Sequence, residues 1–124
     1  MGLISLLDTN IVLYELEGRL EEALPESNLL VSVITEIELL SFSGLSAQDE
    51  TRIRRLLSKI EIVSLDESIK EETIRLRRQQ RLRLPDAIIL ASATVRGAEL
   101  LTNDVDLIKR TSIPSRSLKM KSAV

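Results

Sequence analysis

The chain of 124 residues has the length of a single domain that can bury one hydrophobic core. It contains neither Cys nor His, which excludes disulfide bonds, Ser-His-Asp and Cys-His catalysis, and zinc sites built on those side chains. With 17 basic and 19 acidic side chains, the net charge of −2 gives no overall sign of nucleic-acid binding. Because carboxylates, amides and hydroxyls remain, any metal site is expected to bind a hard cation through oxygen ligands.

The apolar segments are interrupted by charged or turn residues before they reach the roughly 18 residues that a membrane-spanning helix needs. The first residues also lack a basic region followed by a long apolar segment, which is the pattern of a secretory signal. We therefore predict a cytoplasmic protein without membrane contact, and the absence of Cys is compatible with a reducing compartment.

The first half of the chain alternates short apolar runs with segments of helical period. An apolar run ends at Asp8, after which apolar residues recur at helical spacing until Gly18. The stretches "PESN" and "SGLS" are turn signals that separate the later elements. The expected elements of this half are strands at 3–7 and 29–31 and helices at 10–16, 19–24, 32–42 and 47–59.

The second half begins with "IEIVSL", whose alternation predicts a strand. Pro85 at a first helical position begins a helix that is apolar nearly all round and is therefore expected to be buried. The tail "SRSLKMKSAV" is expected to be a frayed end rather than an RNA-binding arm. The expected elements are strands at 60–65 and 99–101, a short edge strand at 113–119, and helices at 66–81, with Leu65, Ile69, Thr73 and Leu76 on one side, and at 85–95.

This alternation predicts an α/β fold with a four- to five-stranded parallel sheet, covered by helices on both faces, in one domain over residues 1–124. Ligands bind such sheets outside the carboxyl ends of the strands. Asp8 and Asp104 follow predicted strands, and Asp86 lies in the first turn of the buried helix. Each alone is explained as a helix cap or a turn residue. Together at one edge they would repel each other unless a divalent cation lies among them.

The sequence pattern alone leaves the roles of two groups of charged residues undecided. Glu36 and Glu38 flank the apolar stripe centred on Ile37 at similar angles, so periodicity does not choose between them. In the predicted helix 66–81 the acidic residues come early and the arginines late, which suits the helix dipole. That order favours a solvated helix end over an RNA-binding strip.

Four motifs, "LLDTN", "SVITEIEL", "LRLPDAIILASA" and "LLTNDVDL", resemble in their order and separation those of the PIN-domain nucleases. Within that family the chain looks like the small VapC-type toxins of prokaryotic toxin–antitoxin pairs. The resemblance covers nearly the whole chain and implies a Rossmann-like, three-layer α/β/α PIN fold. It also implies an endoribonuclease that depends on Mg²⁺ or Mn²⁺ and leaves 3′-hydroxyl and 5′-phosphate ends.

The resemblance also implies roles for single residues. The family's Thr-x-x-Glu-Leu pattern falls on Thr35, Glu38 and Leu39, so Glu38 rather than Glu36 is the implied acid. Asp106 falls where many members carry a further, less constant acid. The implied catalytic residues are Asp8, Glu38, Asp86 and Asp104, the implied metal ligands are Asp8, Asp86, Asp104 and Asp106, and the supporting polar residues are Asn10, Thr35 and Thr102.

The implied reaction is metal-assisted hydrolysis, with the aspartates holding the ion and Glu38 positioning or deprotonating the attacking water. No covalent intermediate is indicated, since Ser and Thr lack a His partner. Tyr14 and Phe42 are the only aromatic residues, so base stacking is not the main source of RNA affinity. Phosphate contacts are expected instead from Arg81, Arg83, Lys109 and Arg110.

The family further implies a homodimer and a cognate antitoxin, whose C-terminal segment covers a groove and inserts a basic residue at the acidic site. Here the groove is expected around Ile11, Leu13, Leu16 and the "SVITEIELL" helix, although a core role for these residues is equally open. Asn103 and Leu107 stand where members often have Arg and Phe, respectively. The first departure bears on RNA contact or on the orientation of the neighbouring acid, and the second on core packing.

Two other functions fit parts of the pattern. One is a PIN fold that has lost turnover and serves in dimerisation or RNA docking, although a disused site is expected to lose its acids. The other is a phosphotransfer domain of the haloacid dehalogenase or receiver type, which also has an Asp after its first strand. The former type needs a second Asp where Asn10 stands, and the latter needs an early pair of adjacent acids that is missing.

Overall fold

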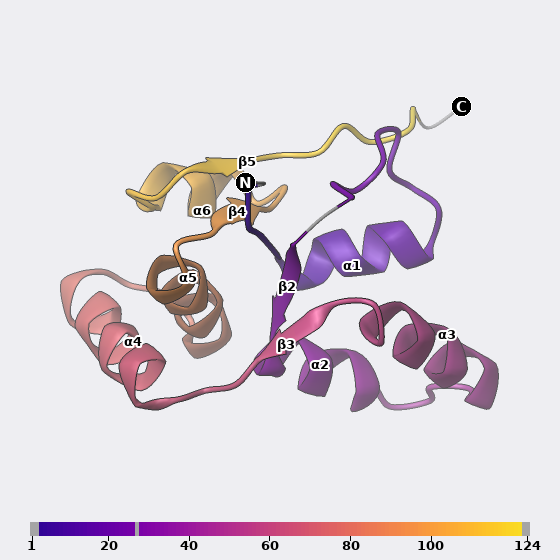
Figure 1. Cartoon of the computed structure of the whole chain (residues 1–124), viewed down its shortest axis with the longest axis horizontal. Helices are drawn as coiled ribbons and strands as arrows, with labels where there is room; N and C mark the ends of the chain where they lie inside the picture. The colour runs from indigo at the N-terminus through magenta and orange to yellow at the C-terminus, as the bar shows by residue number, and fades with distance from the viewer. Residues whose placement is uncertain (1–2, 27, 123–124) are drawn as a thin grey trace.

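A computed structural model describes residues 3–26 and 28–122 and contains, within them, five strands and six helices (Figure 1). The strands are β1 (Ser5–Leu7), β2 (Leu29–Ser32), β3 (Glu61–Val63), β4 (Glu99–Leu101) and β5 (Ser115–Arg116). The helices are α1 (Thr9–Leu16), α2 (Val33–Leu40), α3 (Ala47–Leu57), α4 (Glu67–Gln79), α5 (Leu84–Arg96) and α6 (Val105–Arg110).

The strands form one parallel sheet in the order β3-β2-β1-β4-β5. The central strand β1 pairs with β2 on one side, where Ser5 lies opposite Leu29, and with β4 on the other, where it lies opposite Glu99. The strand order reverses between β1 and β4, and ligands bind open α/β sheets near such a switch point. The predicted α/β class with a parallel sheet is therefore confirmed, with five strands.

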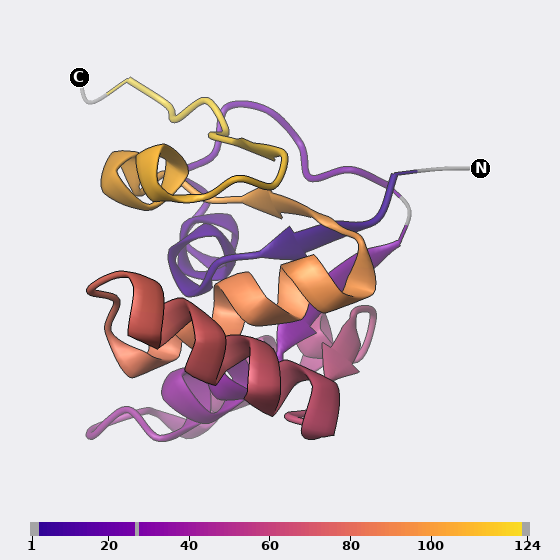
Figure 2. The ribbon, with the colours of Figure 1, turned by 90° about the vertical axis from the view of Figure 1, so that its left-hand side faces the viewer.

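Helices cover both faces of the sheet, because neighbouring residues of each strand point to opposite sides. Leu6 belongs to the core beneath α4, α5 and α6, whereas Leu7 belongs to the core beneath α1, α2 and α3. Figure 1 shows the two helical layers to the left and right of the sheet, and Figure 2 shows α4 and α5 from the front. This is the predicted three-layer α/β/α arrangement.

Short polar side chains fix where the helices begin. Ser32, Ser46 and Asp66 accept hydrogen bonds from backbone N–H groups at the starts of α2, α3 and α4, and these bonds satisfy donors that have no partner inside the helix. Gly97, with a φ of +64°, ends α5 in the left-handed conformation that glycine adopts without strain. As predicted, α5 is buried along most of its length, from Ala87 to Ala93.

Two predictions about irregular segments are wrong. Residues 19–24 form no helix, because their backbone pairs with the end of the chain: Glu21 N donates to Lys119 O, and Lys121 N donates to Arg19 O, both at 2.8 Å. The tail is not frayed over 115–122, since β5 belongs to the sheet and Leu118 is buried. Residues 123–124 lie outside the described residues.

Two smaller differences concern helix content and burial. Asp104, which taken alone was explained as a turn residue, is the N-cap of the short helix α6, and no helix was predicted there. Leu65 was expected on the buried side of α4 but is half exposed, because it precedes the N-cap of that helix. Ile69, Thr73 and Leu76 are buried as predicted.

Candidate functional site

Asp8 is a buried carboxylate held at the junction of β1 and α1. Its Oδ1 accepts from Thr9 N at 2.8 Å, and its Oδ2 accepts from Thr102 Oγ1 at 2.7 Å. Its own N–H donates to Leu101 O at 2.9 Å, which ties the residue to the end of the adjacent strand β4. Asp8 is therefore the N-cap of α1, and its second oxygen faces the switch point between β1 and β4.

Thr102 and Asp104 extend this hydrogen-bond chain along the loop after β4. Thr102 is fully buried, and its hydroxyl also accepts from Asp104 N at 3.0 Å. Asp104 Oδ1 accepts from the N–H groups of Asp106 and Leu107 at the start of α6. The hydroxyl of Thr102 thus bridges the Asp8 side chain, to which it donates, and the Asp104 backbone N–H, from which it accepts.

Burial dominates the electrostatics of Asp8, and two further acids contribute to them. Burial raises the pKa of the Asp8 carboxyl above its ordinary value, and the negative charges of Asp86 and Asp104 raise it further. The hydrogen bonds from Thr102 and Thr9 oppose this shift because they favour the charged form. Residues that lie nearly 100 positions apart in the sequence are therefore close enough to repel one another.

A second chain of polar contacts connects α1 to α2. The hydroxyls of Thr9 and Thr35 lie 2.9 Å apart, and Thr9 Oγ1 donates to Glu38 Oε1 at 3.1 Å. Glu38 is thus hydrogen-bonded to Thr9, the residue that follows Asp8 in the chain. The Glu36 side chain makes no hydrogen bond to a described residue. Asn10 is exposed in the first turn of α1, and its side chain is without a hydrogen bond in the described part of the chain.

Basic side chains lie against two of the acids. Arg83 Nε is 3.3 Å from Asp86 Oδ2, and Arg110 Nε is 3.1 Å from Asp106 Oδ2. A cavity of about 350 Å³ is lined by both pairs, together with Arg81 and Asp104. Five of the predicted acids or RNA contacts thus share a cavity with Asp104, while Lys109, exposed on α6, does not line it. We refer to this cavity as the acid pocket.

The donors at this edge fit a hard divalent cation by their chemistry, since every candidate ligand is an oxygen and the group repels itself without a cation. Within residues 3–26 and 28–122, no three acidic side chains stand close enough together to hold one ion as they are placed. Arg83 and Arg110 supply part of the positive charge that an ion would supply. The residues therefore fit a hard cation in the chemistry of their oxygen donors, while their present placement, with arginines against Asp86 and Asp106, does not form an ion-binding group.

A separate, largely apolar cavity of about 700 Å³ lies between α1, α2 and α3. Leu13 and Leu16 line it, as expected for a groove, and so does Phe42, which is 70% exposed. Ile11 does not line it but is fully buried in the core. Glu38 and Thr9 also line this cavity, so it reaches the second polar chain described above. We refer to this cavity as the apolar groove.

Two residues important to this geometry were not singled out by their pattern. Thr9 of "LLDTN" is hydrogen-bonded to both Thr35 and Glu38. In the sequence it could have been noticed because it stands between Asp8 and Asn10, both of which were predicted site residues. Asn103 was noted only as a departure from the family. Its amide makes two hydrogen bonds to the backbone of Leu118, of 2.8 and 3.0 Å, which attach the end of the chain to the loop after β4.

Residues 5–113 match the model of the PIN domain family. A toxin–antitoxin complex from Klebsiella pneumoniae contains a chain with 33% identity and a TM-score of 0.74, with 90% of this chain and 95% of that chain covered. VapBC-1 from nontypeable Haemophilus influenzae matches with 25% identity and a TM-score of 0.73, covering 93% and 98% of the chains. VapBC2 from Rickettsia felis, solved bound to a promoter DNA fragment, shares the fold at 20% identity and a TM-score of 0.76, covering 94% and 100%. A comparison with curated proteins finds no match.

The chain belongs to the PIN-domain family. Its likeness to chains of VapBC and other toxin–antitoxin complexes confirms the predicted resemblance to VapC-type toxins. The family match decides against the haloacid dehalogenase and receiver alternatives. Among the described residues, no helix is both long enough and apolar enough to cross a membrane.

Proposed function

We propose that this protein is an Mg²⁺- or Mn²⁺-dependent endoribonuclease that acts in the cytoplasm as the toxin of a type II toxin–antitoxin pair. The observation that carries the proposal is the buried Asp8 carboxylate at the carboxyl edge of the sheet, which is hydrogen-bonded to Thr102. Its pKa is raised mainly by burial and to a smaller extent by the charges of Asp86 and Asp104. The family and the related toxin–antitoxin complexes support the nuclease class.

In this proposal Asp8, Asp86 and Asp104 hold the metal, with Asp106 as a further ligand. A bound divalent ion activates water for attack on a phosphodiester and stabilises the charge of the leaving oxygen. Glu38 positions or deprotonates the attacking water. Thr102 and Thr35 are positioning residues, since each makes a hydrogen bond that leads to one of the acids, and Asn10 completes the supporting set.

The arginines of the acid pocket contact the RNA in this proposal. Arg81, Arg83 and Arg110 line the pocket beside the acids, and Lys109 lies on the same short helix as Arg110. Guanidinium groups bind phosphates through two parallel hydrogen bonds. Arg83 and Arg110 would then exchange their present carboxylate partners for phosphate oxygens when a cation and RNA are bound.

The partners follow from the same likeness. We propose that a cognate antitoxin covers the apolar groove, where Leu13 and Phe42 are exposed, and that the toxin forms a homodimer. The groove contains Glu38, which gives a basic residue of the antitoxin an acidic contact beside the site. The related complexes from Klebsiella pneumoniae and Haemophilus influenzae support a partner of this kind.

The test is cleavage of labelled RNA by the purified chain in Mg²⁺, in Mn²⁺ and in EDTA. The wild type should cleave only with metal and leave 3′-hydroxyl and 5′-phosphate ends. Asp8→Asn and Asp86→Asn, purified in the same way, should not cleave. Asp49→Asn, an exposed acid on α3, is the matched control and should retain activity.

Thermal melts separate the nuclease from the inactive alternative. A metal that binds the native state raises its stability by RT ln(1 + [L]/Kd), so Mn²⁺ should raise the Tm of the wild type but not that of Asp8→Asn. Cleavage in EDTA, or by Asp8→Asn, would overturn the assignment. RNA binding without cleavage in either metal would instead establish the RNA-docking or dimerisation module.

A further inference from the structure

Next to the acid pocket, a second, basic cavity lies at the connection between α4 and α5. This cavity has a volume of about 930 Å³ and is lined by residues from the last turns of α4 and from the segment that follows. Arg81, Leu82 and Arg83 line both cavities, so the two adjoin the same segment. We refer to the larger cavity as the basic groove.

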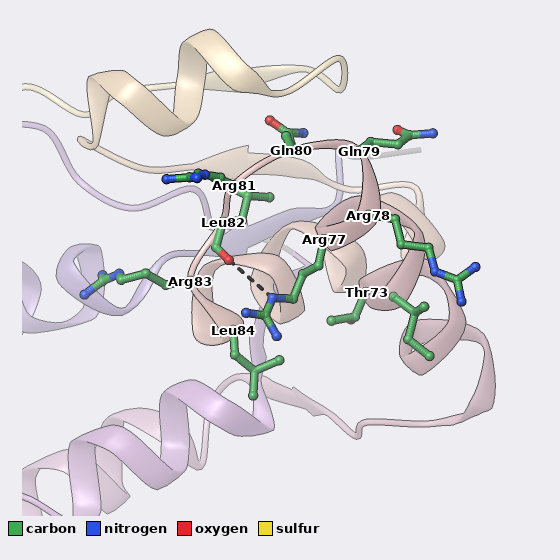
Figure 3. A pocket seen from close by; sticks show the side chains of 10 residues that line it. Thr73, Arg77, Arg78, Gln79, Gln80, Arg81, Leu82, Arg83 and Leu84 are labelled. Atoms are coloured by element: carbon green, nitrogen blue, oxygen red, sulfur yellow. Dashed lines mark hydrogen bonds between the residues drawn. The ribbon is translucent and has the colours of Figure 1, made fainter.

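Four arginines are among the residues that line the basic groove: Arg77, Arg78, Arg81 and Arg83. In the view of Figure 3, Arg77 lies between Arg83 and Arg78 and points inward below Leu82, whereas Arg83 and Arg78 extend outward to opposite sides. Of these, Arg83 has a carboxylate partner, Asp86. Among residues 3–26 and 28–122, no carboxylate lies within ion-pair distance of Arg77 or Arg78, so their charges are available to a ligand.

The helix dipole explains only part of this arrangement. Basic residues in the last turn of α4 are favourable there, and Arg77 and Arg78 fit that explanation. Arg81 and Arg83 lie beyond the end of the helix, where the dipole does not account for them. Arg77 is also held in place, because its Nε donates to Leu82 O at 3.3 Å and leaves the outer N–H groups directed to the groove (Figure 3).

The groove is also partly apolar. Ile74 and Leu84 line it and are 40% and 49% exposed, and the partly buried Leu82 lines it as well. A duplex presents phosphates and sugars to a protein surface, whereas an unpaired strand also presents base faces. Base faces can pack on aliphatic side chains and on guanidinium planes, which suits a groove that combines both and lacks aromatic residues.

We propose that the basic groove binds a single-stranded RNA segment that extends from the acid pocket, with Arg77 and Arg78 contacting its phosphates. This inference rests on the proposed RNA substrate and extends it to unpaired RNA. The groove places the strand over the C-terminal end of α4, away from the apolar groove between α1, α2 and α3. An antitoxin in the apolar groove and an RNA in the basic groove therefore occupy different surfaces.

The test measures binding of fluorescein-labelled oligouridylate to the full chain in EDTA, where cleavage is not expected. Affinity for a single strand falls with salt by a log–log slope of about −0.7 for each phosphate contact. Removing two contacts in R77Q/R78Q should therefore weaken binding and flatten the slope. Between about 50 and 200 mM salt, the wild type should lose about sevenfold more affinity than this variant does.

The matched control is R55Q/K59Q, which makes the same change in charge at the end of α3, where neither side chain forms an ion pair with a described residue. It should keep the wild-type slope. If the double variant does not fold, Arg78→Gln alone suffices, because its side chain makes no hydrogen bond in the described part of the chain. The expected difference is then about two- to threefold.

The proposal would be overturned if R77Q/R78Q kept the wild-type salt slope, or if R55Q/K59Q lost as much affinity as R77Q/R78Q does. It would also be overturned if the wild type bound a blunt RNA duplex as tightly as oligouridylate, or if oligoglutamate competed as well as unlabelled oligouridylate. The last would assign the groove to an acidic peptide. These outcomes are distinct from failure of the nuclease. A wild type that binds oligouridylate through Arg77 and Arg78 but does not cleave RNA refutes the nuclease and retains the groove.

Discussion

Thr102 donates its hydroxyl hydrogen to Asp8 across the boundary between β4 and β1, with 2.7 Å between Oγ1 and Oδ2. Both residues directly follow their strands, and these strands are neighbours at the point where the strand order reverses. The same hydroxyl accepts from Asp104 N. One buried oxygen therefore sets the relative positions of two candidate metal ligands before any ion is bound.

Removing this hydroxyl should destabilise the fold as well as the site. Thr102→Val keeps the shape but leaves a buried carboxylate oxygen and a backbone N–H without their partner. The free energy of unfolding should fall by about 1–3 kcal/mol. The pKa of Asp8 should also rise further, since the lost hydrogen bond favours the charged form. Urea unfolding and carboxyl NMR titration measure the two effects, and Thr102→Ser should show neither.

The raised pKa of Asp8 predicts a pH-dependent cost in stability. The folded state binds the Asp8 proton more tightly than the unfolded chain does, so this contribution to stability falls as pH rises from the ordinary value of 3.8 through the folded pKa. In EDTA, Asp8→Asn should therefore have a higher urea midpoint than the wild type at neutral pH. The difference should shrink on acidification, and a lower midpoint for the variant at neutral pH would contradict this account.

Glu38 and Glu36 can be separated by matched substitutions. Glu38 is hydrogen-bonded to Thr9, beside Asp8, and is the proposed group that positions or deprotonates water. Glu38→Gln should lower the rate of RNA cleavage by about 10²- to 10⁴-fold, the usual range for loss of a general base. Glu36→Gln should cleave at the wild-type rate. The opposite result would move the role to Glu36.

Arg83 should compete with a cation for Asp86. Its side chain is 82% exposed and forms an exposed ion pair, which is a weak interaction. Arg83→Gln should therefore raise the affinity for Mn²⁺ by up to about fivefold, as measured by titration of the free-ion EPR signal. Arg83→Lys keeps the charge and should resemble the wild type. A fall in Mn²⁺ affinity in Arg83→Gln would show that the arginine supports the site instead.

The regular elements near the site could be predicted because their signals are local. The apolar run before Asp8 and the helical spacing after it lie within ten residues, and Pro85 marks the start of α5 next to Asp86. The parallel sheet then followed from the alternation of elements, which placed Asp8 and Asp104 at one edge.

The segments that were mispredicted depend on distant partners or on very short elements. The conformation of 19–24 is set by hydrogen bonds to residues about 100 positions later, which periodicity does not report. The six residues of α6 complete less than two turns, too few for a period to appear. Glu36 and Glu38 were equivalent by angle on the helix, and their surroundings are distinguished by other helices, through the hydrogen bond from Thr9 to Glu38 and the place of Glu38 in the apolar groove.

Asn103 makes the loop between Thr102 and Asp104 depend on the segment after β5. Its amide holds Leu118 by two hydrogen bonds, and β5 joins the sheet beside β4 just before that residue. During translation, Leu118 appears after every proposed metal ligand has been made. A chain cut before Leu118 would therefore contain every proposed ligand but would leave the loop between Thr102 and Asp104 without this anchor.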